Sequence, residues 1–252
     1  MSTISNNAKA VFEKISQQAM LPLYFHKRRE VSLSALQALY AAGIRVVEYT
    51  NRGQEALENF KAMLALRNAS MPDMLLGIGT IKNEHQAKDY HEAGADFLIS
   101  PCFYQPISDY VQKHNLTWIP GCMSASEINL AAQNGVGFVK LFPGNLLGPG
   151  YVSAIKPLFP DLLFMPTGGV SLEQENIQGW FKAGVTAVGM GSKLITNDVL
   201  ENEDYATLTN TTKKFWHSPK RLKTIYNDKS STEASGQVPV DNMCTTVCSY
   251  HN

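Results

Sequence analysis

The chain has no excess of charge of either sign. Its 252 residues include 22 Lys and Arg and 22 Asp and Glu, so the formal net charge is zero at pH 7. Proteins that bind nucleic acids or anionic membrane surfaces rely on clustered positive charge, which displaces counterions or meets lipid headgroups. We therefore expect neither a nucleic acid nor a membrane as partner, and look instead for a small molecule or another protein.

Long apolar runs and closely paired cysteines are also missing. No stretch reaches the roughly 20 apolar residues of a membrane span, and residues 1–18 are polar and helix-like, unlike a signal peptide, so we expect a cytoplasmic protein. Four cysteines are too few for a disulfide framework here, and none has the spacing of a structural zinc site. We expect reduced thiols and no metal or other cofactor. A metal at Cys244, Cys248 and His251 would require the C-terminal residues to fold around it.

Short apolar runs recur about every 24 residues, which is the length of one strand, one helix and their loops. The segments between them are helical in pattern, with Ser or Asn at several starts and Gly at the ends. Eight such units predict an α/β fold, a (β/α)8 TIM barrel with an extra N-terminal helix. The apolar runs are 21–25, 45–49, 74–79, 96–100, 117–120, 137–142, 162–166 and 186–190.

The same pattern divides the chain into a barrel and a tail. We expect a single barrel domain over residues 1–220, in which 1–18 cover the bottom and 203–216 supply the eighth helix. Residues 228–252 are rich in Ser and Thr and have no period of 3.6 or 2. Such a composition predicts a polar, flexible tail.

The glycines that end four of the predicted helices set a common register. Counting five residues from each of them reaches the same height in the following strand. Alternate strands of such barrels contribute the inward side chains of one layer, so Glu48 and Lys140 are expected to project inward from opposite walls near the C-terminal mouth. The glycines are Gly43, Gly94, Gly135 and Gly184, and the residues reached are Glu48, Ile99, Lys140 and Gly189.

Lys140 and Glu48 interrupt otherwise apolar strands. Burial removes the hydration of a lysine and favours the neutral amine, which is the form that adds to a carbonyl. A facing carboxylate that shuttles protons completes the requirement for Schiff-base chemistry. A structural salt bridge is the alternative. Arg52, where the second strand ends, is a candidate clamp for a substrate carboxylate or else a solvated loop residue.

Two glycine-rich loops follow the seventh and eighth predicted strands. They contain Gly168 and Gly169 in PTGGVS, and Gly191 and Ser192 in GMGS. Backbone N–H groups in these two loops commonly bind phosphate in barrels, although turn glycines are also frequent without any ligand. Thr80, at the end of the third strand, offers a hydroxyl to a carboxylate or is simply a turn residue.

Other polar residues near the strand ends carry weaker signals. His26 and Lys27 follow the first strand and either touch a substrate or line the rim. Cys102 and Cys122 follow the fourth and fifth strands, but no histidine neighbours them in sequence, so packing is the better interpretation.

Eight short motifs follow one another along residues 21–195, in the order LPLYFHK, RVVEYTNRG, GIGTI, AGADFLISP, IPGCMSASE, FVKLFPG, MPTGGVS and GMGSKLI. In sequence and in order they resemble the 2-keto-3-deoxy-6-phosphogluconate (KDPG) and 4-hydroxy-2-oxoglutarate (KHG) aldolase family, which are class I aldolases of the Entner–Doudoroff type. The resemblance implies that Lys140 forms the Schiff base and that Glu48 is the general acid and base. It implies that Arg52, Thr80 and Thr167 hold the carboxylate end, and that the two glycine loops, with Ser192, hold the phosphate. It also implies a homotrimer without a metal.

The expected reaction is cleavage of a phosphorylated 2-keto-3-deoxy sugar acid to pyruvate and glyceraldehyde 3-phosphate. Unphosphorylated 4-hydroxy-2-oxoglutarate is a second possible substrate. Two other functions stay open at this point. One is a cofactor-free isomerase or epimerase of phosphorylated sugars with Glu48 as base, and the other is a catalytically silent barrel that binds phosphorylated ligands. The sequence leaves the preferred sugar-acid epimer undecided.

Overall fold

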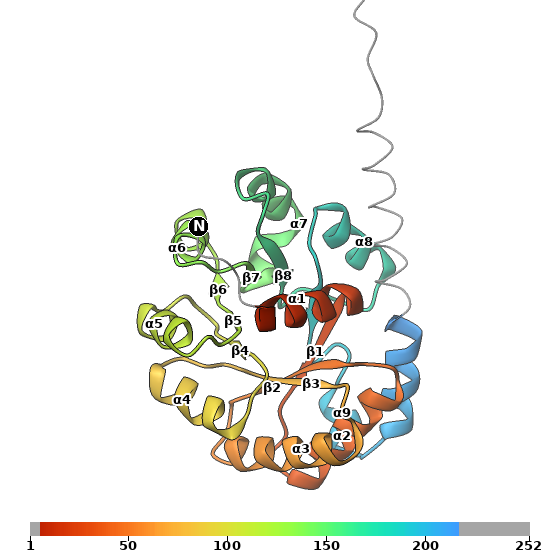
Figure 1. Ribbon diagram of the computed structural model, residues 1–252. Helices are drawn as coiled ribbons and strands as arrows, with labels where there is room; N and C mark the ends of the chain where they lie inside the picture. The colour runs from red at the N-terminus through yellow and green to blue at the C-terminus, as the bar shows by residue number, and fades with distance from the viewer. Residues whose placement is uncertain (1–5, 217–252) are drawn as a thin grey trace, which may run out of the picture.

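The computed structural model describes residues 6–216, and strands and helices alternate along this part of the chain (Figure 1). The strands are β1 (Met20–Tyr24), β2 (Val46–Thr50), β3 (Leu75–Gly79), β4 (Leu98–Ile99), β5 (Trp118–Ile119), β6 (Gly121–Cys122), β7 (Phe138–Leu141), β8 (Leu163–Pro166) and β9 (Val188–Met190). The longer helices are α1 (Asn6–Gln18), α2 (Arg29–Ala41), α3 (Ala56–Ser70), α4 (Glu84–Ala93), α5 (Gln105–Lys113), α6 (Ala125–Gln133), α7 (Gly144–Ile155) and α8 (Gln174–Lys182). Shorter helices follow at Lys156–Leu158 and at α9 (Asn197–Glu201), and residues 205–216 are again helical.

All the paired strands are parallel and form a curled sheet with helices α2 to α8 around its outside (Figure 1). Six strands pair in the order β5-β4-β3-β2-β1-β9, and three pair in the order β6-β7-β8. An isolated bridge between Thr167 and Gly189 joins the end of β8 to β9. The α/β class predicted from the repeats is therefore confirmed, as a curled parallel sheet.

Each of the eight apolar runs contains a strand, but the fifth is interrupted. Pro120 separates β5 from β6, and because proline has no N–H it cannot donate to a ladder. The Pro120 carbonyl still accepts a hydrogen bond from the N–H of Lys140 at 2.9 Å. β5 thus pairs with β4 on one side, while β6 pairs with β7 on the other.

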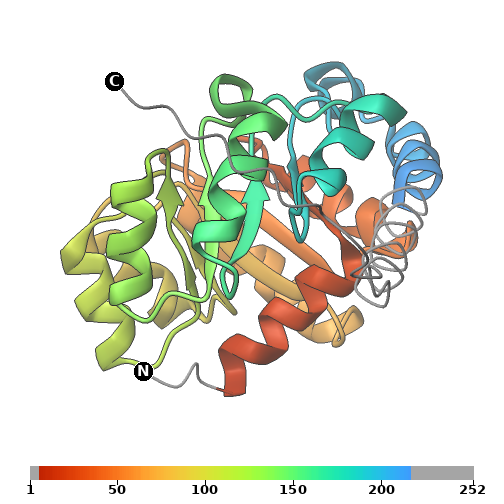
Figure 2. The same ribbon diagram turned by 90° about the horizontal axis from the view of Figure 1, so that it is seen from above.

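The inner face of the sheet is apolar at its lower end. Side chains alternate between the two faces of a strand, so every second residue faces inward. On β2 the inward-facing residue after Val46 is Glu48, and on β7 the inward-facing residue after Phe138 is Lys140. Helix α1 covers this lower end, and its Phe12 ring packs against Phe138 with centroids 5.4 Å apart. Figure 2 shows α1 at the end of the sheet where the strands begin, opposite their carboxyl ends. Polar inner residues are therefore confined to the opposite, carboxyl end.

Some expectations fall on residues outside the described range. The predicted tail over 228–252, with Cys244, Cys248 and His251, belongs to them. Among residues 6–216, no helix combines the length and the apolar character needed to cross a bilayer. Within the same range, no three His, Cys, Asp or Glu side chains gather closely enough to hold a metal ion.

Candidate active site

Lys140 and Glu48 meet inside the curled sheet at its carboxyl end. The Lys140 Nζ lies 3.7 Å from the Glu48 Oε1, and the two side chains are 7% and 0% exposed. They come from β7 and β2, which are not paired with one another. The register predicted from the helix-ending glycines thus brings together two ionisable groups that are far apart in sequence.

The Glu48 carboxylate is unusual because it is buried without hydrogen bonds. Neither of its oxygens has a hydrogen-bond partner among the described residues. Burial raises the pKa of Glu48, and the nearby positive charges of Lys140 and Arg52 oppose this by lowering it. The net rise favours a carboxyl group that exchanges protons closer to neutral pH than an exposed glutamate does.

Gly79, at the end of β3, leaves the space that this carboxylate occupies. A Cβ built on Gly79 would overlap Glu48 Oε1, and would lie 2.6 Å from its Cδ. Gly79 pairs across the β2–β3 ladder with Thr50, which is two residues beyond Glu48 on β2. The missing side chain of Gly79 leaves room for the Glu48 carboxylate. Glycine is required here by close approach rather than by backbone conformation.

We expect the Gly79→Ala variant to lose activity by about 10- to 100-fold, because the added methyl group pushes the carboxylate out of line with Lys140. Overpacking of this kind also destabilises a fold, typically by about 1–3 kcal/mol. Gly77→Ala is the matched control, since a Cβ there meets the Phe97 ring instead. Turnover and thermal unfolding of both variants would be measured. Equal activity losses at equal destabilisation would contradict a specific effect on Glu48.

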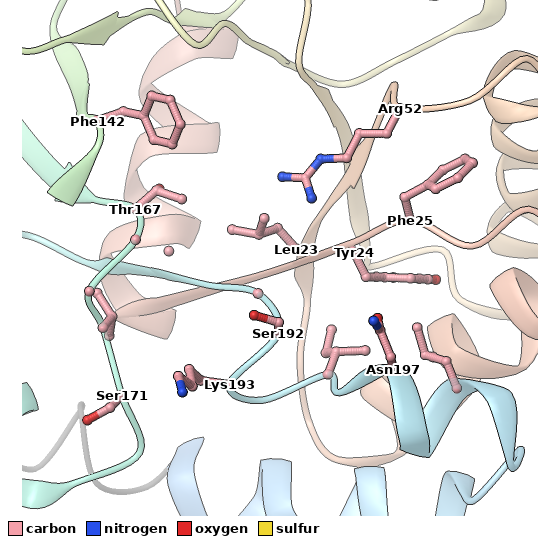
Figure 3. A pocket seen from close by; sticks show the side chains of 17 residues that line it. Leu23, Tyr24, Phe25, Arg52, Phe142, Thr167, Ser171, Ser192, Lys193 and Asn197 are labelled. Carbon is pink, nitrogen blue, oxygen red and sulfur yellow. The ribbon is translucent and has the colours of Figure 1, made fainter. Parts of the chain in front are cut away.

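A cavity of about 530 Å³ opens at the same end of the sheet. Six of the residues predicted for the site line it, namely Arg52, Thr167, Gly168, Gly169, Gly191 and Ser192. Arg52 reaches in from one side, and Ser192 lies on the opposite side (Figure 3). Phe142 also lines the cavity, and its ring centroid is 5.3 Å from the Lys140 Nζ. The Lys140 amine therefore lies next to a residue of the cavity wall, while Lys140 and Glu48 themselves do not line the cavity.

Two threonines predicted for the carboxylate end differ in their surroundings. Thr167 is 7% exposed, lines the cavity, and its Oγ1 has no hydrogen-bond partner within the described part of the chain. Thr80 lies outside the cavity lining and directly follows Gly79. Its φ of +66° is an uncommon conformation for a residue with a Cβ, and such strain is often found at functional sites. The Thr167 hydroxyl is thus a buried polar group beside the cavity that no described residue satisfies.

The first glycine loop is shaped by two left-handed residues, Gly168 with φ +87° and Gly169 with φ +72°. A Cβ on Gly169 would lie 2.7 Å from the Cα of Asn145, so the loop also packs tightly on the start of α7. Sequence reasoning missed Ser171, Lys193 and Asn197, which line the same cavity. Lys193 could have been found, because it directly follows the GMGS motif.

Three other candidates fall outside the cavity. The buried His26 ring accepts the Arg28 N–H at Nδ1 (3.1 Å) and lies 3.2 Å from Glu201 through Nε2, so it links the loop after β1 to the end of α9. Cys122 is buried, and burial raises its pKa to about 12, which suits packing and not nucleophilic attack. Cys102 is exposed, so the packing interpretation was wrong for that residue.

Known proteins are similar to this chain in sequence and in fold. The family model described as KDPG and KHG aldolase matches residues 11–211. The 2-dehydro-3-deoxy-phosphogluconate aldolase of Pseudoalteromonas atlantica is 33% identical over 202 residues, 79% of this chain and 90% of that protein. The KHG/KDPG aldolase of Escherichia coli K12 is 32% identical over 192 residues, 75% of this chain and 87% of that protein. The crystal structure of KDPG aldolase from Legionella pneumophila, with pyruvate captured at low pH as a covalent carbinolamine intermediate, matches with a TM-score of 0.75 and 30% identity, over 84% of this chain and 98% of that one.

Proposed function

The chain belongs to the KDPG and KHG aldolase family, and we propose on this basis that it is a class I aldolase that cleaves KDPG to pyruvate and glyceraldehyde 3-phosphate. The reaction makes it an aldehyde-lyase. Cleavage of 4-hydroxy-2-oxoglutarate to pyruvate and glyoxylate is a second activity of the same site. The observation that carries the proposal is the 3.7 Å approach of the Lys140 amine to the buried Glu48 carboxylate, whose oxygens make no hydrogen bond within residues 6–216.

The chemistry follows from the positions of these two groups. The neutral Lys140 amine adds to the C2 carbonyl, and loss of water gives a protonated imine. Glu48 supplies and removes the protons of these steps, and then takes the C4 hydroxyl proton directly or through a water. The C3–C4 bond breaks, its electron pair moves toward the imine, and glyceraldehyde 3-phosphate leaves. Protonation at C3 and hydrolysis of the imine release pyruvate and regenerate the amine. The carbinolamine captured in the Legionella relative supports the first of these steps.

We assign the two ends of the cavity to the two charged ends of the substrate. Arg52, Thr167 and Thr80 bind the carboxylate; Arg52 and Thr167 line the cavity, and the buried Thr167 hydroxyl has no hydrogen-bond partner within residues 6–216. The backbone of Gly168, Gly169 and Gly191 and the Ser192 hydroxyl bind the phosphate. Support comes from the cavity lining, which contains all of these residues except Thr80.

The proposal extends to the architecture and the assembly. We infer a closed (β/α)8 barrel with α1 as the extra N-terminal helix, in one domain over residues 1–220. It is supported by the bridge from Thr167 to Gly189 and by the position of β5 and β6 on either side of Pro120. A homotrimer, a cytoplasmic location and a role in Entner–Doudoroff carbohydrate metabolism rest on the family resemblance alone. Sedimentation equilibrium would test the trimer.

Two assays test the proposed activity. Incubation with pyruvate and borohydride should add a stable mass at Lys140, because reduction traps the imine. Release of pyruvate from KDPG would be followed by coupling to lactate dehydrogenase. A phosphosugar isomerase or epimerase would neither trap pyruvate nor release it, and a silent barrel would bind ligands without turnover. Comparison of gluconate-derived, galactonate-derived and unphosphorylated substrates would settle the preference.

Lys193 adds a positive charge to the phosphate end of this cavity, close to Ser192 (Figure 3). We expect Lys193→Ala to raise the KM for KDPG by about fivefold, since one exposed charge-assisted contact contributes on the order of 1 kcal/mol. The KM for 4-hydroxy-2-oxoglutarate, which has no phosphate, should change less than twofold. Lys182→Ala, on α8, is the control for loss of a surface charge. Equal KM changes for both substrates would contradict this assignment.

A further inference from the structure

One side chain outside the cavity lining holds the first glycine loop in shape. Asn176 lies in the first turn of α8, and its side-chain amide reaches back to the loop. The Oδ1 accepts a hydrogen bond from the Ser171 N–H, and the Nδ2 donates one to the Gly169 carbonyl, both at 3.0 Å. A backbone N–H can only donate and a carbonyl can only accept, so these two partners fix the orientation of the amide. A single side chain therefore spans residues 169–171.

The hydrogen bond to the Gly169 carbonyl also orients the next N–H group. In a planar trans peptide, the carbonyl of one residue and the N–H of the next point in opposite directions. Because the Gly169 carbonyl points to Asn176, the Val170 N–H points away from α8. Val170 lines the cavity together with Gly168 and Gly169.

The carbonyl and N–H groups of this loop are used differently. The Thr167 carbonyl accepts from the Gly144 N–H at 2.8 Å, and the Gly169 carbonyl accepts from Asn176. Within residues 6–216, the N–H groups of Gly169 and Val170 make no hydrogen bond to the protein. Successive free N–H groups form a binding site for an anion, provided that the backbone is held in one conformation.

We propose that Asn176 is a positioning residue that holds loop 167–171 ready for a phosphate monoester, and thereby sets the preference for phosphorylated over unphosphorylated substrates. The assignment rests on the proposed aldolase function. Asn176 touches no reacting atom and acts only through the backbone of Gly169 and Ser171.

A purely structural role in capping α8 is the competing explanation. The N-cap residue Glu173 makes no side-chain capping hydrogen bond, and its own N–H reaches only the Ser171 Oγ at 3.4 Å. Loss of a cap lowers stability and affects every substrate alike. A loss of loop order affects only the phosphate end. The two explanations therefore differ in how KM changes between substrates.

The test compares Asn176→Ala, Asn176→Asp and the control Gln174→Ala, an exposed position on the same helix turn. For Asn176→Ala we expect the KM for KDPG to rise about tenfold, from the loss of two hydrogen bonds, while kcat and the KM for 4-hydroxy-2-oxoglutarate stay within twofold. Asn176→Asp keeps an acceptor for the Ser171 N–H but turns a carboxylate toward the Gly169 carbonyl, so it should be at least as impaired with KDPG. If the alanine variant does not fold, the aspartate variant answers the question. Equal changes with both substrates, or none, would overturn the proposal.

Failure of the aldolase function is recognised separately. Pyruvate and borohydride should label Lys140 equally in the wild type and in Asn176→Ala, because that end of the site is untouched. If the wild type is neither labelled nor active, binding of inorganic phosphate measured by titration calorimetry decides the role of Asn176. About tenfold weaker phosphate binding by Asn176→Ala supports it, and equal affinity, or no binding by the wild type, overturns it.

Discussion

Replacement of Lys140 by Met is expected to abolish aldol cleavage, with kcat reduced on the order of 10⁴-fold or more, because no other group forms the imine. Methionine is unbranched and of similar length, so it fills the 7% exposed site without a cavity. It also leaves Glu48 without its ion-pair partner, which favours the protonated carboxyl. The variant should therefore fold and bind phosphate while releasing no pyruvate. The coupled pyruvate assay measures the loss.

Peptide mapping of the borohydride-trapped protein provides the control. Burial lowers the pKa of Lys156, but its Nζ donates hydrogen bonds of 2.8 Å to the carbonyls of Pro160 and Leu162. Its amine is thus occupied, and we expect no label there. Activity that survives in Lys140→Met would instead favour an isomerase or epimerase with Glu48 as its base.

The pairing of Lys140 with Glu48 was predictable because the local signals along the chain agree. The four helix-ending glycines all adopt positive φ, from +77° at Gly135 to +100° at Gly94, as a left-handed helix end requires. The residues three past these glycines, Val46, Phe97, Phe138 and Ala187, all belong to the apolar cluster inside the sheet, so counting two further residues reaches the same face of each strand. The positions of the helix-ending glycines, which are a local feature of the chain, therefore predicted the contact between Lys140 and Glu48.

Features that depend on contacts between loops could not be predicted in this way. Asn176 is one of many polar residues at a helix start, and only the folded loop reveals that its amide spans Gly169 and Ser171. The break at Pro120 was not predicted, although proline has no N–H to donate, and the use of its two sides by different strands is a property of the curled sheet. Helix α7 also contains a kink that was not predicted, because Gly148 inside it has the non-helical angles φ +69° and ψ +169°. Such features follow from tertiary packing, which single-residue propensities do not contain.

Glu48→Gln is expected to lower kcat by about 10²- to 10⁴-fold, the range typical for loss of a general acid and base. The amide has the same shape as the carboxylate, and because neither Glu48 oxygen makes a hydrogen bond, the substitution removes none. The KM should change little, since the cavity lining is intact. Trapping of pyruvate on Lys140 should still occur, but more slowly, because the amine remains while its proton shuttle is gone. Equal rates of trapping in the variant and the wild type would contradict the assigned role.

The pH dependence of the wild type gives the same assignment an independent test. Burial raises the pKa of Glu48 despite the opposing charges of Lys140 and Arg52. A base with a raised pKa becomes protonated at a higher pH. As the pH is lowered, kcat should therefore begin to fall at a higher pH than expected for an exposed glutamate, whose pKa is near 4.3. On this acid side, log kcat plotted against pH should have a slope of about one, as expected for the binding of one proton. This dependence should vanish in Glu48→Gln, which has no carboxyl group to protonate at this position. An acid limb that persists unchanged in Glu48→Gln would assign the titration to another group and leave Glu48 as a structural partner of Lys140.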